Sequence, residues 1–477
     1  MSREICADYN QLLMFPPAVD DWVGSDHPAR FVRDFVDSLD LESLGFRVRE
    51  SPMGRPSYGV GLLLKVWLYG YLNSIRSSRK LERGCKEHMG LIWLTGMQAP
   101  DHNTIWRFWL DNKKVLKKVF KQSVRIAFDA DLLGLVVHAV DGTKIMACSS
   151  RRKVWHKEDL EKLLAKLDES ISEIMGQVER AQRNEVGEYR LPESLQDHEE
   201  RKEFIQQAIR KLEEEDANHL HPGEPDARLM KNGRTIELSY NAQAMADQES
   251  GMIVGADVVN EENDSSQLVP MLDQVQENLG ETAQENLADG SYASAAQIDL
   301  AEKAGYSILT NPGLTEESRS SDSENKPYHS SQFIYDEDND WCICPQGSTL
   351  PFVGTKPSRW KTHELRLYRC RSYRQCPHRY QCTSGKRGRT IEITPYHHAV
   401  VRQRQKRRDA VNKELLKARK AIIEPLFGWI KSNLGFRRWT VRGLENVKAQ
   451  WSLLCTTINL KKLYRHWVGG AFRVAKC

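Results

Sequence analysis

Hydrophobic and polar positions along the chain follow two different periods. Up to about residue 130, apolar residues recur every three or four positions, as over residues 31–36, which places them on one side of a helix. Residues 132–145 are almost continuously apolar, which is typical of a central β-strand. Residues 236–246 alternate between apolar and polar residues, which predicts another strand. After a turn, residues 252–259 are predicted to form the strand that pairs with it. The pattern predicts a helical N-terminal region followed by a β-sheet.

A helical pattern interrupts this predicted sheet. A second helix is predicted at about residues 199–215, and a first helix before it carries leucine, isoleucine and valine at alternating spacings of four and three. That spacing forms the seam of a coiled coil. Because the seam is short, we expect the two helices to form an antiparallel hairpin within one chain rather than a dimer zipper. The seam residues are Leu160, Leu164, Leu167, Ile171, Ile174 and Val178.

Helices and strands alternate after the two antiparallel strands. The pattern predicts a helix over residues 265–279, a short strand that ends at Asp289, a helix over residues 294–304 and a strand over residues 306–310. Antiparallel strands followed by alternating helix and strand predict an α/β fold, in which a mixed sheet is flanked by helices.

The formal net charge of +4 averages two unlike segments. Residues 366–442 are crowded with lysine and arginine, whereas residues 158–216 are rich in glutamate. A basic C-terminal half predicts a polyanionic partner. No apolar run approaches the roughly 18 to 20 residues of a membrane span, and the first residues do not begin a signal peptide. We therefore expect a soluble, intracellular protein whose thiols stay reduced.

Two aspartates stand next to predicted strands. Asp141 lies within the apolar run 132–145, and Asp289 stands where a short strand meets Gly290. Each Asp-Gly pair alone is most simply a turn signal. An unpaired carboxylate in apolar surroundings is costly, however, so each should find a cation or a hydrogen-bond partner.

A third acid lies on a basic helix. Glu424 and Lys431 are seven residues apart, which places them two turns apart on one face. Pro425 lacks an N–H, so we expect Glu424 to lie in a first helical turn or at a kink. The simpler alternative is a basic amphipathic helix with one solvated glutamate.

Together the three acids resemble the catalytic residues of the Asp-Asp-Glu transposases of bacterial insertion sequences. The segments V-D-G-T-K, A-D-G-S-Y and E-P-L-F-G-W-I-K resemble the three catalytic motifs of that family and occur in the same order. The resemblance extends from His27 to Leu463. One departure concerns Lys417 and Lys420, which stand where some related families have Tyr and Arg. Positive charge is kept there, but the role of that tyrosine is not transferable.

The resemblance implies an RNase-H-like mixed sheet flanked by helices, with an all-α N-terminal domain, a helical-hairpin insertion and a small Cys-rich insertion. The expected parts are a helical DNA-end-binding domain (1–130), the first strand of the catalytic core (131–153), the helical hairpin (154–218), the rest of the core sheet with the second Asp (219–311), the Cys-rich insertion (312–396), and the catalytic-Glu helix with the C-terminal helices (397–477).

The resemblance also implies a DNA transposase that cleaves and joins the ends of an insertion-sequence element by two-metal phosphoryl transfer. Two Mg²⁺ (or Mn²⁺) ions prefer oxygen ligands, and Asp141 would bridge them while Asp289 and Glu424 each complete one. Lys431 would hold a phosphate near the scissile bond. The other basic residues expected to contact DNA here are Lys417, Lys420, Arg437, Arg438 and Arg442.

The partners implied are double-stranded DNA, both terminal inverted repeats and target DNA, with a dimer on paired ends in the bacterial cytoplasm and nucleoid. Two other functions stay open: an RNase-H-like nuclease without strand transfer, and a non-catalytic zinc-bearing DNA-binding protein. No G-x-x-x-x-G-K-[ST] phosphate loop occurs, which argues against an ATP-driven enzyme.

A short helix after Pro100-Asp101 is the candidate for DNA recognition. Short helices joined by tight turns resemble a helix-turn-helix. The alternative is an ordinary helical bundle in which Trp106 and Trp109 are core residues. The polar positions expected to face DNA are His102, Asn103, Thr104 and Arg107.

Half of the ten cysteines fall in the predicted Cys-rich insertion. In a reducing compartment, clustered thiols favour metal over disulfides, and four thiolates suit a structural zinc ion. Five residues separate Cys376 from the cysteine on either side, which is no standard zinc signature. The expected ligands are Cys344, Cys370, Cys376 and Cys382, with Cys342 or His378 as substitutes.

Overall fold

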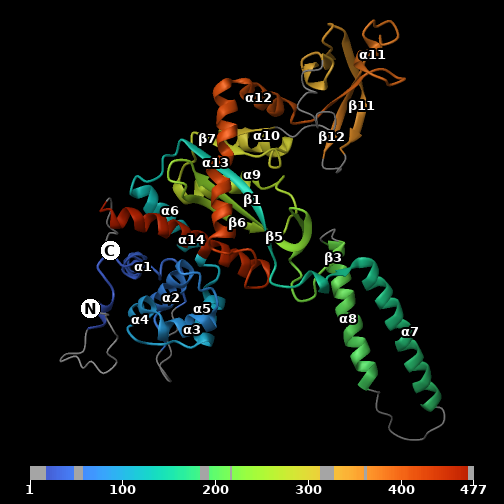
Figure 1. The fold of residues 1–477 in the computed structure, drawn as a ribbon. Coiled ribbons are helices and arrows are strands. Elements are labelled where there is room, and N and C mark those ends of the chain that lie inside the picture. Colours follow the sequence, from blue (N-terminus) through green and yellow to red (C-terminus); the bar gives the residue numbers. More distant parts are fainter. Residues whose placement is uncertain are drawn as a thin grey trace, which may run out of the picture.

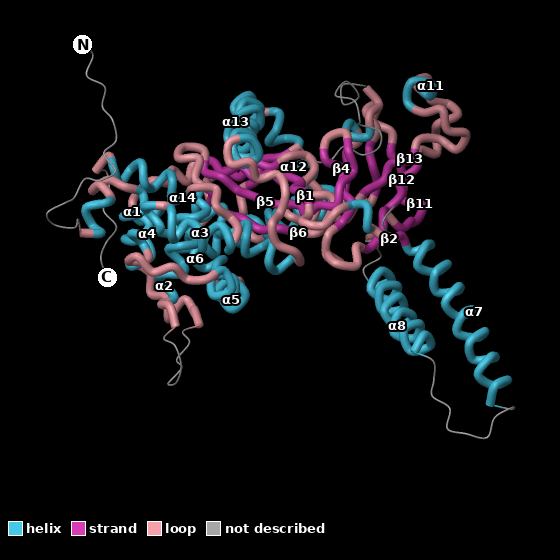
Figure 2. The backbone as a smooth tube through the Cα atoms, turned by 60° about the horizontal axis from the view of Figure 1, so that its bottom comes forward, coloured by secondary structure: helices cyan, strands magenta, loops and turns pink. Residues whose placement is uncertain are grey.

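The computed structural model describes residues 18–47, 57–182, 193–214, 218–311, 327–358 and 363–470. Figure 1 shows a central sheet with three parts around it: the N-terminal helices, a long helical hairpin that projects from the body, and a second, smaller sheet. Figure 2 shows the same hairpin standing clear of the sheets. The chain is thus a mixed α/β protein with extensions on a central sheet.

The described part of the N-terminal region is helical, as predicted. Its core contains large side chains that are almost fully buried, among them Leu64, Trp67 and Trp109. A 3-10 turn at Val19–Trp22 precedes the helices. These are α1 (Pro28–Asp37), α2 (Val60–Leu72), α3 (Ser78–Glu87), α4 (Met89–Leu94), α5 (His102–Asn112) and α6 (Leu116–Asp129).

The central sheet has the strand order β4-β5-β1-β7-β8, and β6 also pairs with β5. Strand β5 pairs antiparallel with β1, β4 and β6, whereas β1–β7 and β7–β8 are parallel. The strands are β1 (Val137–Met146), β4 (Arg228–Asn232), β5 (Thr235–Asp247), β6 (Ile253–Val259), β7 (Glu285–Ala288) and β8 (Ile308–Thr310).

The first strand begins later than predicted, at Val137 instead of residue 132. Asp131 and Leu135 have φ values of 57° and 49°, in the left-handed region, and a strand cannot contain such residues. Leu133 is nonetheless buried in the main core. The apolar run therefore contributes Leu133 to the core before the strand begins, whereas Val136, directly before the strand, is exposed.

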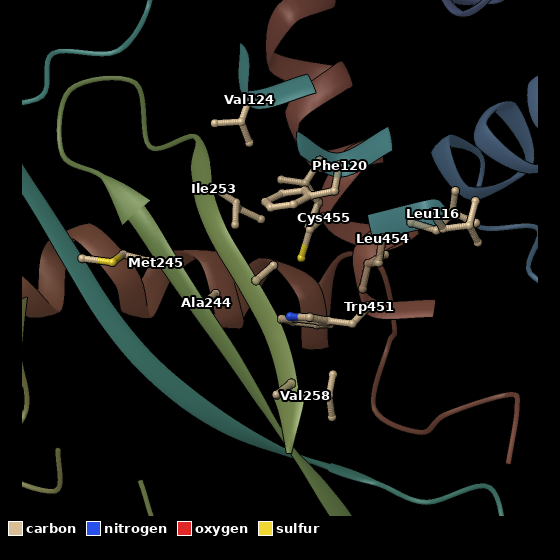
Figure 3. Packing of buried hydrophobic residues seen from close by; sticks show 14 of the residues in the cluster. Leu116, Phe120, Val124, Ala244, Met245, Ile253, Val258, Trp451, Leu454 and Cys455 are labelled. Atoms are coloured by element: carbon tan, nitrogen blue, oxygen red, sulfur yellow. The ribbon is translucent and has the colours of Figure 1, made fainter. Parts of the chain in front are cut away.

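Five helices cover the sheet, and α14 connects it to the N-terminal helices. In Figure 3, Trp451, Leu454 and Cys455 of α14 lie between β6 and α6. One continuous core therefore spans both regions. Although α14 has 25 residues, neither it nor another helix of the described part is long and apolar enough to cross a bilayer. The five are α9 (Leu268–Leu279), α10 (Ala295–Lys303), α12 (His397–Arg408), α13 (Ala410–Ser432) and α14 (Leu444–Val468).

The hairpin consists of α7 (Lys157–Gln182) and α8 (Glu193–Glu214), with β2 (Trp155–His156) paired to β3 (His219–Leu220) at its base. The two helices pack against each other within one chain, as predicted. Of the seam, Leu160 and Leu167 are buried, and they share a small cluster with Ile205 and Leu212 of α8. The side chain of Val178 lies outside the described residues.

The Cys-rich region forms a second antiparallel sheet, which the sequence pattern did not predict. Its strand order is β13-β12-β11-β10-β9, and only six buried residues form its core. The strands are β9 (Ile334–Asp336), β10 (Trp341–Ile343), β11 (Thr349–Pro357), β12 (Glu364–Arg369) and β13 (Thr390–Ile393), with a short helix α11 (Arg379–Cys382) before the last.

Candidate active site

Asp141 and Asp289 lie on neighbouring parallel strands. Asp141 is in the middle of β1, and Asp289 directly follows β7. In the register of the two strands Ala139 lies opposite Leu287. Each aspartate is two residues further along its strand, so the pairing places the two carboxylates side by side at the end of β7.

Arg419 of α13 contacts both aspartates. Its Nη1 donates to Asp141 Oδ2 at 3.1 Å, and its Nη2 lies 3.4 Å from Asp289 Oδ1. The arginine side chain is only 7% exposed, so this is a sheltered charge cluster rather than a surface ion pair. Sequence analysis missed Arg419. The available signal was its spacing: it lies four and seven residues before two buried residues of α13, Ile423 and Leu426.

Burial raises the pKa of the Asp141 carboxyl above its ordinary value. The adjacent Arg419 guanidinium is the largest influence that lowers it, and the charge of Asp289 raises it slightly. Desolvation disfavours the charged form of an acid, whereas a nearby cation favours it. The two aspartates therefore form a site that demands a cation, and in this structure Arg419 supplies it.

Glu424 does not join the two aspartates. The side chain is exposed, and in the described part of the chain no hydrogen bond or ion pair involves it. At about 3.6 residues per turn, Glu424 lies roughly 140° around the helix from Arg419, so it points away from the aspartates. Of the two alternatives for Pro425, a first helical turn or a kink, the first is wrong, because α13 begins at Ala410 and Pro425 lies inside it.

Lys431 is part of a cluster of basic side chains. It is partly buried, and burial lowers its pKa, as do the charges of Arg437 and Lys144. Lys144 lies three residues after Asp141 on β1, and its Nζ is 3.6 Å from Asp264 Oδ1. A desolvated lysine beside other cations is a good position for a phosphate group.

A polar network next to Asp141 was not predicted. Asn241 Nδ2 and Gln243 Nε2 each donate to Asp264 Oδ1 at 2.7 Å, and the Tyr292 hydroxyl donates to Gln243 Oε1. A Cβ at Gly142 would approach Gln243 Nε2 to 2.6 Å and Asp264 Oδ1 to 2.7 Å, so a larger residue there would force these two side chains to shift. This network ties β5 and the segment before α9 to the loop that follows Asp289.

In the candidate recognition helix α5, some polar side chains bind neighbouring residues and others are exposed to solvent. His102 Nδ1 lies 2.8 Å from Glu82 Oε2, and the Thr104 hydroxyl donates to Asp101. Asn103 and Arg107 are exposed and one turn apart. Trp109 is a core residue and Trp106 is half-buried, in agreement with the alternative of a helical bundle for these two side chains.

The basic residues expected to contact DNA lie in the middle of α13 and in the segment after it. The Lys417 ammonium pairs with Glu414 at 2.8 Å, and Lys420 is exposed. After the helix, Met146 at the end of β1 pairs with Arg438 through a parallel bridge. The exposed arginines of this segment are Arg437, Arg438 and Arg442.

The four expected zinc ligands lie in one small region. Cys344 Sγ accepts hydrogen bonds from the backbone N–H groups of Gln346 (3.4 Å) and Ser348 (3.3 Å). Burial raises the pKa of Cys382, and the charges of its neighbours raise it further; these are Cys344, Cys370 and Cys376. Cys342 is instead buried in the core of the small sheet, with its pKa raised to about 12, so it is unsuited as a substitute ligand.

Neither expected metal site is fully assembled. Across the described ranges, no group of three or more His, Cys, Asp or Glu side chains is arranged to hold a metal ion. For the acidic site the reason is geometric, because Arg419 lies between the aspartates and Glu424 points elsewhere. The donor chemistry still fits, since Asp141 and Asp289 converge on one cation.

Two family models match the chain. Residues 17–109 match a transposase domain (DUF772), and residues 343–464 match a transposase DDE domain. The second match contains Glu424, Lys431 and the four cysteines, but neither Asp141 nor Asp289. The resemblance to Asp-Asp-Glu transposases of insertion sequences is confirmed by these matches, which indicate a transposase function and DNA as a partner. No curated protein matches the sequence.

Proposed function

We propose, from these two transposase matches, that the protein cleaves and joins the ends of an insertion-sequence element by phosphoryl transfer. The observation that carries the proposal is the convergence of Asp141 and Asp289 on the Arg419 guanidinium. The Asp141 side chain is 23% exposed and that of Asp289 is 51% exposed, so the pair is open to solvent on one side while the buried Arg419 guanidinium holds the other. Two carboxylates that converge on one cation in this way are suited to binding a metal ion.

The fold supports the same proposal. The strand order β6-β5-β1-β7-β8, with three antiparallel strands followed by two parallel ones, is the order expected of an RNase-H-like sheet. In that arrangement the acids lie at the end of the parallel strands, under a helix from the C-terminal part of the chain. We infer that α13 is this helix, because Arg419 reaches the acids from it.

Asp141 and Asp289 are the residues that would hold divalent metal, with Glu424 as the third. When bound, two Mg²⁺ (or Mn²⁺) ions supply an activated oxygen nucleophile and charge relief at the leaving 3′ oxygen. Arg419 must then leave the carboxylates, which frees a cation beside the reacting strand. Lys431 and Lys144, which are close enough for their charges to interact, would hold the phosphate and keep it oriented. Glu424 reaches the site only if α13 turns or shifts.

The test is a cleavage and joining assay with the element's own ends. We expect no product without divalent metal, 3′-OH ends with Mg²⁺, and strand-transfer products when target DNA is added. Cleavage without any joining would favour the nuclease alternative. DNA binding without cleavage in Mg²⁺ or Mn²⁺ would favour the non-catalytic alternative and contradict the proposal.

For recognition of the element ends we propose α5, acting as a dimer on paired ends. Asn103 and Arg107 are the exposed polar side chains on its outer face, and their spacing suits the edge of a DNA groove. His102 and Thr104 have local partners and would support the helix rather than face bases.

Arg419→Met is expected to move the acid limb of Mg²⁺-dependent cleavage to higher pH. A protonated carboxylate is a poor ligand, so activity exists above the pKa of Asp141 and is lost as the pH falls through it. Removal of the cation raises that pKa further. Single-turnover cleavage rates measured over a range of pH give the midpoint of this acid limb. Arg419→Lys keeps the charge and is the matched control; an unchanged limb in Arg419→Met would show that Asp141 does not set it.

We also propose one structural zinc ion on Cys344, Cys370, Cys376 and Cys382. The two backbone N–H groups that point at Cys344 Sγ would stabilise a thiolate, and Arg389 lowers the pKa of Cys382. A core of six buried residues is small for an independent sheet, so metal binding would contribute folding free energy.

Elemental analysis of protein purified without chelator is expected to give about one zinc per chain. Cys376→Ser should lose that zinc and make the small sheet sensitive to protease. Cys342→Ala is the matched control, because this cysteine lies outside the group, and it should keep the metal. Zinc-free wild-type protein that resists protease would rule the site out.

A further inference from the structure

A second basic site lies beyond the end of β1. A pocket of about 700 Å³ is lined by the loop 148–152, by Glu237 and Leu238 of β5, and by Arg438. Strand β1 leads from the aspartates toward the base of the hairpin, where this loop begins (Figure 1). The pocket is therefore on the same strand as the acidic site but separate from it.

The arginines around the pocket are held by the backbone. Arg438 Nη1 donates to the carbonyl of Ala147 at 2.9 Å, and Arg151 Nη1 donates to the carbonyl of Ile236 at 2.7 Å. A guanidinium has five N–H donors, so each of these arginines keeps several for another acceptor. With Arg152, three positive charges line the pocket against one carboxylate, Glu237.

Ser149 provides a second and independent indication of a ligand. Its side chain lines the pocket and is 5% exposed, yet its Oγ has no hydrogen-bond partner among the described residues. The backbone of Ser149 is fixed, because its N–H donates to the buried Glu224 carboxylate at 2.8 Å. A buried hydroxyl without a partner is costly, and an acceptor in the pocket would remove the cost.

We propose that this pocket binds one backbone phosphate of the DNA, away from the bond that is cut. The inference rests on the proposed function for the identity of the DNA. Five residues of strand separate Asp141 from Met146, which is about 17 Å at roughly 3.3 Å per residue. For a duplex that runs along β1, at about 3.4 Å per base pair, the phosphate held here lies about five base pairs from the scissile one.

The first test uses equilibrium binding of duplex DNA at several salt concentrations. Arg152→Ala should weaken binding and reduce the slope of log K against log salt by about 0.9, the value for one lost phosphate contact. Within the described residues, the Arg152 side chain has no hydrogen bond or ion pair that the change would remove. Ser149→Ala should weaken binding without changing the slope, because it removes a neutral donor. Lys303→Ala, on α10, is the control and should change neither.

The second test determines which phosphate of the DNA the pocket binds. Replacing single phosphates by neutral methylphosphonates should reduce wild-type binding at a position about five base pairs from the cut, and Arg152→Ala should be insensitive there. Unchanged salt slopes in Arg152→Ala would overturn the inference. Inorganic phosphate binding with an unchanged DNA slope would assign the pocket to a free anion and overturn it too. A changed slope in protein that never cleaves DNA would support the pocket and contradict the proposed function.

Discussion

Asp141→Asn is expected to reduce strand cleavage in Mg²⁺ by on the order of 10⁴-fold, the scale seen when one member of a catalytic unit is removed. Asp289→Asn should behave in the same way. An amide has nearly the shape of a carboxylate but is a poor ligand for a hard divalent ion. DNA affinity should change by less than about threefold, because phosphate contacts elsewhere set it.

Single-turnover cleavage and equilibrium binding, measured on the same DNA, separate the two effects. Asp257→Asn is the matched control: it lies on β6 of the same sheet, where its carboxylate is 3.4 Å from the Lys448 ammonium. Glu424→Gln decides whether α13 moves. If it cleaves at the wild-type rate, Glu424 is no ligand and the arrangement seen here, with two aspartates alone, is the active one. Wild-type cleavage by Asp141→Asn would refute the site.

Trp451→Ala is expected to lower the free energy of unfolding by about 3–5 kcal/mol, the usual cost of truncating a buried tryptophan. Trp451 of α14 is fully buried against the sheet (Figure 3). Its Nε1 donates to the carbonyl of Gln243 at 2.9 Å. The variant leaves a cavity in the core that joins the N-terminal helices to the sheet. Urea denaturation followed by circular dichroism measures the loss.

Two variants serve as controls for this result. Trp451→Phe keeps most of the volume and should cost less. Val411→Ala removes a side chain that is 68% exposed on α13 and should stay within about 0.5 kcal/mol of wild type. Because Gln243 also donates to Asp264, the damage should reach the active-site network, so Trp451→Ala should cleave slowly even below its unfolding transition. An unchanged unfolding midpoint would contradict the packing.

The sequence by itself determined the features that depend on neighbours along the chain. A period of two identified β5, the turn after it identified β6 as the returning strand, and a seam of apolar residues identified the α7–α8 hairpin, because each of these patterns is local to one element or one turn. It also located Asp141 and Asp289, since a carboxylate inside an apolar run stands out whatever the fold. It failed for the small Cys-rich sheet, whose short strands bury too few residues to show a period.

Only the tertiary structure decided which side chains meet. The parallel register of β1 and β7 brings Asp141 and Asp289 together across 148 positions of sequence, and Arg419 reaches them from a helix still further along the chain. No local spacing encodes such contacts. The direction of Glu424 likewise follows from how α13 rotates on the sheet, because burial of Arg419 and Ile423 turns the glutamate outward. Local pattern gives each residue its element, and long-range packing gives it its neighbours.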